Sequence, residues 1–150
     1  MTLLDKLTAS LKEAMVKRDD FKTSVLRMLI AAVRNKEIEK KGKGQQLTDD
    51  DVMDVLRKEV KKRKEASLMY QTAGRQESAD AEERELQLIE TFLPAQMSEN
   101  DIELIVSEVL KAFENPTQKD FGAIVKAVKE KTGNNADGGV IAQIVKKKLG

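Results

Sequence analysis

The most concentrated basic segment of this sequence runs from residue 57 to residue 64. Its basic residues are Arg57, Lys58, Lys61, Lys62, Arg63 and Lys64. Within an α-helix, Arg57, Lys61 and Lys64 share one face because they are spaced at i, i+4 and i+7. Such a ridge can contact the phosphate groups of a nucleic acid, or it can be a solvated helix face. Both interpretations stay open, and the ridge is the first candidate nucleic-acid-binding surface.

Base reading by this ridge is not expected, because the chain has few aromatic side chains. Its 150 residues include one tyrosine, four phenylalanines and no tryptophan. Proteins that bind single strands stack the bases on aromatic rings. Any nucleic-acid binding is therefore expected to follow shape and backbone. Four phosphate contacts would give a salt slope of about −3.6, or roughly a hundredfold loss of affinity between 50 and 200 mM salt.

Two charged residues of the same segment, Glu59 and Arg63, fall on its apolar face. That face is predicted from the helical spacing of Val52, Val55, Leu56, Val60, Ala66 and Tyr70. Glu59 precedes Arg63 by four residues, the favourable order for a helical ion pair. A structural pair that bridges to another helix and a functional polar cluster are the two interpretations. Arg27 and Arg34, seven residues apart on the preceding predicted helix, could complete such a cluster.

A second candidate for phosphate binding is the segment Asp137-Gly138-Gly139, which is predicted to open the last helix. Backbone N–H groups at a helix N-terminus attract anions, and glycine leaves them uncovered. The alternative is a simple turn and helix cap, in which the glycines serve a tight backbone. Gly138 and Gly139 therefore join the candidate nucleic-acid-binding residues.

The residue types that most enzymes use for side-chain catalysis are missing. The sequence has no cysteine and no histidine, which excludes Cys–His and Ser–His–Asp relays and the commonest metal ligand. No serine lies in a glycine-rich turn that would supply an oxyanion hole. The three acids after Thr48 suit the first turn of a helix better than a divalent cation site. No catalytic residue, no metal and no cofactor is predicted.

The spacing of apolar residues predicts helices along the whole chain and no strand. The expected ranges are 2–18, 21–41, 48–72, 76–92, 98–113, 118–131 and 137–149. Thr48, Ser98 and Asp137 are predicted N-caps, and Ala73-Gly74 is a predicted stop signal. The helix over 21–41 is apolar on more than one side, so we expect more than one neighbour to contact it.

The clearest predicted boundary is Leu93-Pro94, because proline disfavours helical backbone at the residue before it. The longer helices before it predict an N-terminal helical domain over residues 1–93. The three shorter helices after it predict a compact three-helix domain over residues 94–150. The expected fold class is therefore all-α, with about four helices followed by a three-helix bundle.

Charge and hydropathy set the expected surroundings of the chain. Its 27 basic and 26 acidic residues nearly balance, so no global field draws it to nucleic acid or membrane. No apolar run is long enough to span a bilayer, and Asp5 lies where a secretory signal needs an apolar core. The lack of cysteine fits a reducing compartment. We expect a cytoplasmic protein that does not bind membranes; the sequence sets no oligomeric state.

Four segments of the sequence form a recognisable series. They are Ser24–Glu39 (SVLRMLIAAVRNKEIE), Leu56–Ala66 (LRKEVKKRKEA), Phe92–Val106 (FLPAQMSENDIELIV) and Ala136–Leu149 (ADGGVIAQIVKKKL). Together they resemble the YqeY family, whose C-terminal part is similar to the tail domain of the GatB subunit of the glutamine-dependent transfer-RNA amidotransferase. The resemblance implies two helical units, the second a GatB-like three-helix tail.

The resemblance also implies a function. The GatB tail is associated with holding transfer RNA, so the chain is expected to be a non-catalytic module that associates with transfer RNA or with a complex that modifies or aminoacylates it. The family label offers an alternative, an amidotransferase-type carbon–nitrogen ligase with glutamine as the amido-nitrogen donor. A protein–protein adaptor that uses the apolar surplus of helix 21–41 is a third hypothesis. Fold similarity alone does not choose among them.

Overall fold

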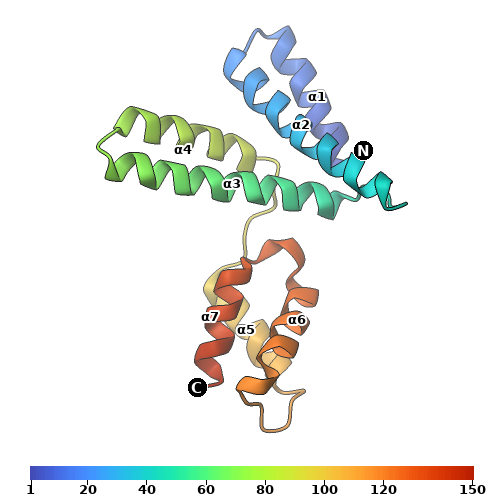
Figure 1. Cartoon of the computed structure of the whole chain (residues 1–150), viewed down its shortest axis with the longest axis vertical. Helices are drawn as coiled ribbons and strands as arrows, with labels where there is room; N and C mark the ends of the chain where they lie inside the picture. The colour runs from blue at the N-terminus through green and yellow to red at the C-terminus, as the bar shows by residue number, and fades with distance from the viewer. The chain divides into compact units, whose positions relative to one another are not determined.

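The computed structural model describes the backbone of residues 1–150 and every side chain except that of Asn134. Helices account for all the regular structure in this described part, and it contains no strand (Figure 1). The prediction of an all-α fold is confirmed. The chain divides into two units, Met1–Leu93 and Pro94–Gly150.

The N-terminal unit consists of two helical hairpins. The first pairs α1 (Leu3–Val16) with α2 (Asp20–Gly42), and the second pairs α3 (Asp49–Thr72) with α4 (Gln76–Glu90). Figure 1 shows α3 and α4 side by side along most of their lengths, and α2 contacts both α1 and α3. The prediction that this second helix has more than one neighbour is therefore confirmed.

One apolar core joins all four helices of this unit. Its buried members are Leu7, Ala14, Val25, Leu26, Leu29, Val33, Val52, Leu56, Val60, Leu86 and Ile89. Most of them recur at spacings of three, four or seven residues along their helix, which places them on one face of each helix. On α2, most of the apolar surplus seen in the sequence is absorbed in this core, while Phe21 and Ile38 stay 44% and 68% exposed.

The start of α3 is fixed by side-chain hydrogen bonds. Thr48 is the N-cap, as predicted, and its hydroxyl accepts a hydrogen bond from the Asp51 N–H, while the Asp51 carboxylate accepts one from the Thr48 N–H. Lys40 of α2 lies 3.0 Å from the same carboxylate. The neighbouring Asp49 accepts a hydrogen bond from the N–H of Leu3 at 3.0 Å, so the N-termini of α1 and α3 are tied together.

The turn between α3 and α4 needs a glycine. Gly74 has φ of +74°, a conformation that side chains with a Cβ rarely adopt, and it follows the α3 C-cap at Ala73. The predicted stop signal at Ala73-Gly74 is confirmed.

The C-terminal unit has three short helices around its own core. They are α5 (Glu99–Leu110), α6 (Phe121–Thr132) and α7 (Gly138–Lys148), with the 3-10 turns η1 (Gln118–Asp120) and η2 (Gly133–Asn135). The buried residues are Ile102, Val106, Val109, Ile124, Val128, Ile141 and Val145. The N–H of Met97 donates to the Asn135 carbonyl at 2.7 Å, which ties the segment before α5 to the segment before α7.

Two boundaries in this unit differ from the prediction. Helix α5 ends at Leu110, before Phe113, although both side chains pack against the core. The apolar spacing continues into a turn, so periodicity alone overstates the helix length. The segment from Gln118 begins as 3-10 turn η1, because Thr117 and Asp120 form a capping box one turn before α6. Ser98 and Asp137 are N-caps as predicted.

In the part of the chain that the structure describes, no helix combines the length and the apolar character needed to cross a bilayer.

The capping contacts at the start of α3 predict an acid-dependent loss of stability. The hydrogen bond from the Thr48 backbone, followed by the one from Lys40, lowers the pKa of Asp51. A lowered carboxyl pKa stabilises the fold above the ordinary value of about 4, and this stabilisation is lost as pH falls through the lowered value. Asp51→Asn should reduce the free energy of unfolding by about 1 kcal/mol at pH 7, and the difference should shrink toward pH 2.

Urea unfolding at both pH values measures this difference. The matched control is Asp20→Asn in the first turn of α2, since the Asp20 carboxylate has no hydrogen bond or ion pair within the described residues. A loss of equal size at pH 7 and pH 2 for Asp51→Asn would contradict the assignment.

Candidate functional site

The outer surface of α3 carries four lysines with free ammonium groups. Lys58, Lys61, Lys62 and Lys64 are all exposed, and none lies within ion-pair distance of a carboxylate in the described part of the chain. We call them the α3 lysine face. Glu65 is an exposed acid within this face. Unpaired lysines keep their full charge available to an anionic partner.

Arg57 is less exposed than its spacing with Lys61 and Lys64 predicted. Its side chain is half-buried, and burial is the main cause that lowers its pKa, while Glu90 and Asp54 act in the opposite direction. The charges of Asp54 on α3 and Glu90 on α4 are therefore near enough to act on the guanidinium. Of the predicted ridge Arg57–Lys61–Lys64, Lys61 and Lys64 are therefore exposed, and Arg57 is half-buried.

The second predicted feature, the charged pair on the apolar face of α3, is present as an ion pair. Arg63 is 7% exposed, and its Nη1 lies 2.6 Å from Glu59 Oε2. Its Nε donates to Glu85 Oε2 of α4 at 3.0 Å, and its Nη2 lies 2.6 Å from the Met28 sulfur of α2. We call Met28, Glu59, Arg63 and Glu85 the Arg63 cluster. One guanidinium thus contacts three helices.

The contacts of the Arg63 cluster are those of a structural element. A buried cation needs nearby anions to offset the loss of its hydration, and Arg63 has two. One turn further along α3, the hydroxyl of the buried Ser67 donates to the Ala79 carbonyl of α4 at 3.2 Å. The two interactions hold the same pair of helices, α3 and α4, at successive turns.

Arg27 and Arg34 do not complete this cluster. Arg27 is exposed and has its Nη2 4.0 Å from the Met15 sulfur, and Arg34 is exposed and paired with Glu37 at 3.0 Å. The partner that sequence reasoning missed is Glu85. The sequence signal is only partial: Glu85 lies four residues before Ile89 and so shares its side of α4, but this spacing does not identify a partner on another helix.

At the predicted site at the start of α7, a lysine ammonium group lies close to the backbone, and one backbone N–H is already hydrogen-bonded to a carboxylate. The Asp137 carboxylate accepts a hydrogen bond from the Gly139 N–H at 2.7 Å. A Cβ added at Gly138 would lie 3.4 Å from the ammonium nitrogen of Lys129, so this lysine of α6 lies over the start of α7. A phosphate arriving here would meet the Lys129 ammonium together with the negative charge of Asp137.

Among the described side chains, no group of three or more acids is arranged to hold a metal ion. The acids after Thr48 act at the start of α3, where Asp51 closes the capping box.

Comparison with known proteins identifies the family. The family model described as "Yqey-like protein" matches residues 4–149, which includes both units. The chain belongs to the YqeY family.

Several curated proteins named "Altered inheritance of mitochondria protein 41, mitochondrial" are similar to this YqeY-family chain. The one from Vanderwaltozyma polyspora is 32% identical over 58% of this chain and 46% of its own length. The one from Clavispora lusitaniae is 26% identical over 85% and 75%, and the one from Eremothecium gossypii is 34% identical over 61% and 49%. The YqeY-family chain thus spans about half the length of two of these relatives.

These names overturn the cytoplasmic location expected from the sequence, because each of the three relatives is named as a mitochondrial protein. The expectation rested on missing cysteine and a missing apolar segment. The lack of cysteine is compatible with a reducing environment, and the lack of a long apolar segment is compatible with an aqueous one. Neither feature identifies a cellular compartment.

The Arg63 cluster predicts a large difference between two arginine substitutions. Arg63→Met leaves Glu59 and Glu85 without their cation and should lower the free energy of unfolding by about 3 kcal/mol. This is the low end of the usual range for a broken buried pair, because the Glu85 side chain is 35% exposed. Arg34→Met removes the exposed ion pair with Glu37 and should change the free energy of unfolding by less than about 1 kcal/mol.

Urea unfolding at pH 7 measures both effects. Adding Glu59→Leu and Glu85→Gln to Arg63→Met removes the two carboxylates that have lost their cation. The triple variant should therefore regain part of the lost free energy of unfolding. Equal losses for the two arginine variants, or no restoration in the triple variant, would show that the cluster does not hold the helices together.

Proposed function

We propose that this YqeY-family chain is a non-catalytic helical module that associates with transfer RNA or with a complex that handles it. The observation that carries the proposal is the α3 lysine face, whose four exposed ammonium groups have no carboxylate partner in the described structure. Phosphate contacts by such groups position a nucleic acid without reading its bases. Membership of the YqeY family, with the GatB-like C-terminal part that the sequence resembles, favours transfer RNA as the nucleic acid.

The C-terminal unit supports the proposal through the start of α7. Lys129 lies over Gly138, where backbone amides and the helix dipole already favour an anion. Because Asp137 occupies one amide, we expect this position to contribute less than the lysine face. It serves as a secondary phosphate contact.

The absence of histidine and cysteine from the sequence supports a role without side-chain catalysis. The aromatic content supports backbone recognition, because only five aromatic rings (four Phe and one Tyr) occur in the chain.

Binding of the full chain to transfer RNA should be strongly salt-dependent. If the four lysines each contact a phosphate, the salt slope should be about −3.6, which corresponds to roughly a hundredfold loss between 50 and 200 mM salt. The double variant Lys61→Gln/Lys64→Gln should reduce the magnitude of the slope by about 2 and weaken binding to different transfer RNAs to a similar extent. Filter binding across a salt series measures both quantities.

The matched control is Lys6→Gln/Lys12→Gln on α1, which removes two equally exposed lysines outside the lysine face and should leave the slope unchanged. Affinity no better than millimolar at 50 mM salt would exclude the proposal. Incubation of the same preparation with glutamine, ATP and mischarged transfer RNA tests the ligase alternative, and turnover by the chain alone would contradict a non-catalytic role.

A further inference from the structure

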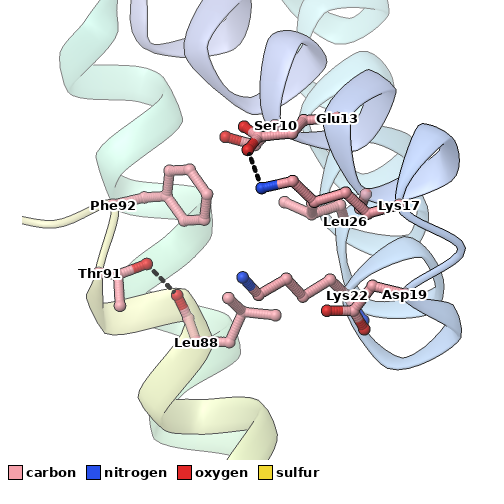
Figure 2. Close-up of a pocket in the computed structure, with 10 residues that line it drawn as sticks. Ser10, Glu13, Lys17, Asp19, Lys22, Leu26, Leu88, Thr91 and Phe92 are labelled. Atoms are coloured by element: carbon pink, nitrogen blue, oxygen red, sulfur yellow. Dashed lines mark hydrogen bonds and ion pairs between the residues drawn. The ribbon is translucent and has the colours of Figure 1, made fainter.

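The N-terminal unit contains a cleft that the proposed RNA association does not use. It has a volume of about 300 Å³ and lies where the α1–α2 turn meets the C-terminal end of α4 (Figure 2). Small-molecule sites in proteins begin at about this size. None of the residues that line it belongs to the α3 lysine face.

The cleft is lined by two carboxylates and two ammonium groups, and one of the ammonium groups forms no direct ion pair. The Lys17 ammonium lies 2.6 Å from a Glu13 oxygen, and this hydrogen bond lowers the pKa of Glu13 and raises the pKa of Lys17, so the two neutralise each other. The Asp19 carboxylate accepts the backbone N–H of Lys22 at 3.1 Å as the N-cap of α2. The Lys22 ammonium lies within ion-pair distance of no carboxylate of the described residues, although its charge is a minor cause of the lowered pKa of Glu13.

The opposite wall of the cleft is apolar. Figure 2 shows the ring of Phe92 and the side chain of Leu88 facing the ammonium groups of Lys17 and Lys22 across the hollow. Leu26, at the base of the same cleft, is 1% exposed and belongs to the core of the unit. The apolar wall therefore rests on a packed core, which keeps its shape when the cleft is empty or filled.

The hydroxyl of Thr91 lies on the same side of the cleft as Leu88 and Phe92 (Figure 2). It donates to the Leu88 carbonyl at 2.6 Å, which fixes the last turn of α4 and leaves its oxygen free to accept a hydrogen bond.

We propose that this cleft binds a small molecule that has one anionic group on an apolar body, with the anion at the Lys22 ammonium and the body against Leu88 and Phe92. A carboxylate and a phosphate monoester share this chemistry. The Lys17 ammonium is already paired with Glu13, so a second anionic group on the ligand would have no free ammonium group there.

The proposal is tested with four probes added to the full chain and followed by the backbone amide signals in two-dimensional NMR. Phenyl phosphate and phenylacetate have both an anion and an apolar ring, inorganic phosphate has only the anion, and benzyl alcohol has only the ring. We expect saturable shifts at Lys17, Lys22 and Thr91 with one or both of the first two probes, and affinity at least about tenfold weaker for the last two. The tighter of phenyl phosphate and phenylacetate identifies the anion.

The decisive variant is Lys22→Gln, which should weaken the tighter probe about tenfold. Lys22 is exposed, so the fold should be kept, and circular dichroism verifies this. Lys12→Gln, an exposed lysine of α1 that does not line the cleft, should bind like the unmodified chain. Unchanged affinity in Lys22→Gln, equal binding of inorganic phosphate or benzyl alcohol, or no saturation by any probe below about 20 mM would overturn the proposal. These outcomes are independent of RNA binding, because the cleft and the α3 lysine face share no residue.

Discussion

The helices of the N-terminal unit depend on the partners of a single buried guanidinium. Removing an arginine side chain from water costs several kcal/mol, and nearby anions must offset this cost. Arg63 obtains one anion, Glu59, from its own helix and the other, Glu85, from α4, and it also contacts Met28 of α2. If α4 shifted along α3 by one helical turn, Glu85 would move by about 5.4 Å. The Arg63 guanidinium would then lose its anionic partner on α4. Apolar contacts tolerate such a slide better, so the ion pair specifies which register the two helices adopt.

The sequence predicted the helices well because their ends are determined locally. Thr48, Ser98 and Asp137 cap the helices that follow them, since each needs only an amide two or three residues away. The stop at Gly74 likewise depends only on the backbone conformation that glycine permits. Boundaries failed where apolar residues continue past a helix end, as at Phe113, because packing against a core does not require helical backbone.

The candidate site was harder to predict because it depends on which helices meet. The spacing correctly placed Arg63 and Glu59 on the buried face, but it could not show that Glu85 of α4 would complete the cluster. The same limit explains Arg57, which shares a face with Lys61 by spacing but is half-buried in the folded chain. A helical wheel gives the direction of a side chain, and only tertiary packing decides what lies in that direction.

The order of the helices has a consequence for how the chain acquires its structure. Most contacts in the N-terminal unit join helices that follow one another, α1 with α2 and α3 with α4. Such short-range topologies have low contact order and fold in microseconds to milliseconds. The hydrogen bond from Leu3 to Asp49 spans 46 residues and joins the start of α1 in the first hairpin to the start of α3 in the second. The two hairpins can therefore form separately and early. Their docking against each other is the step that requires contacts between residues far apart in the sequence.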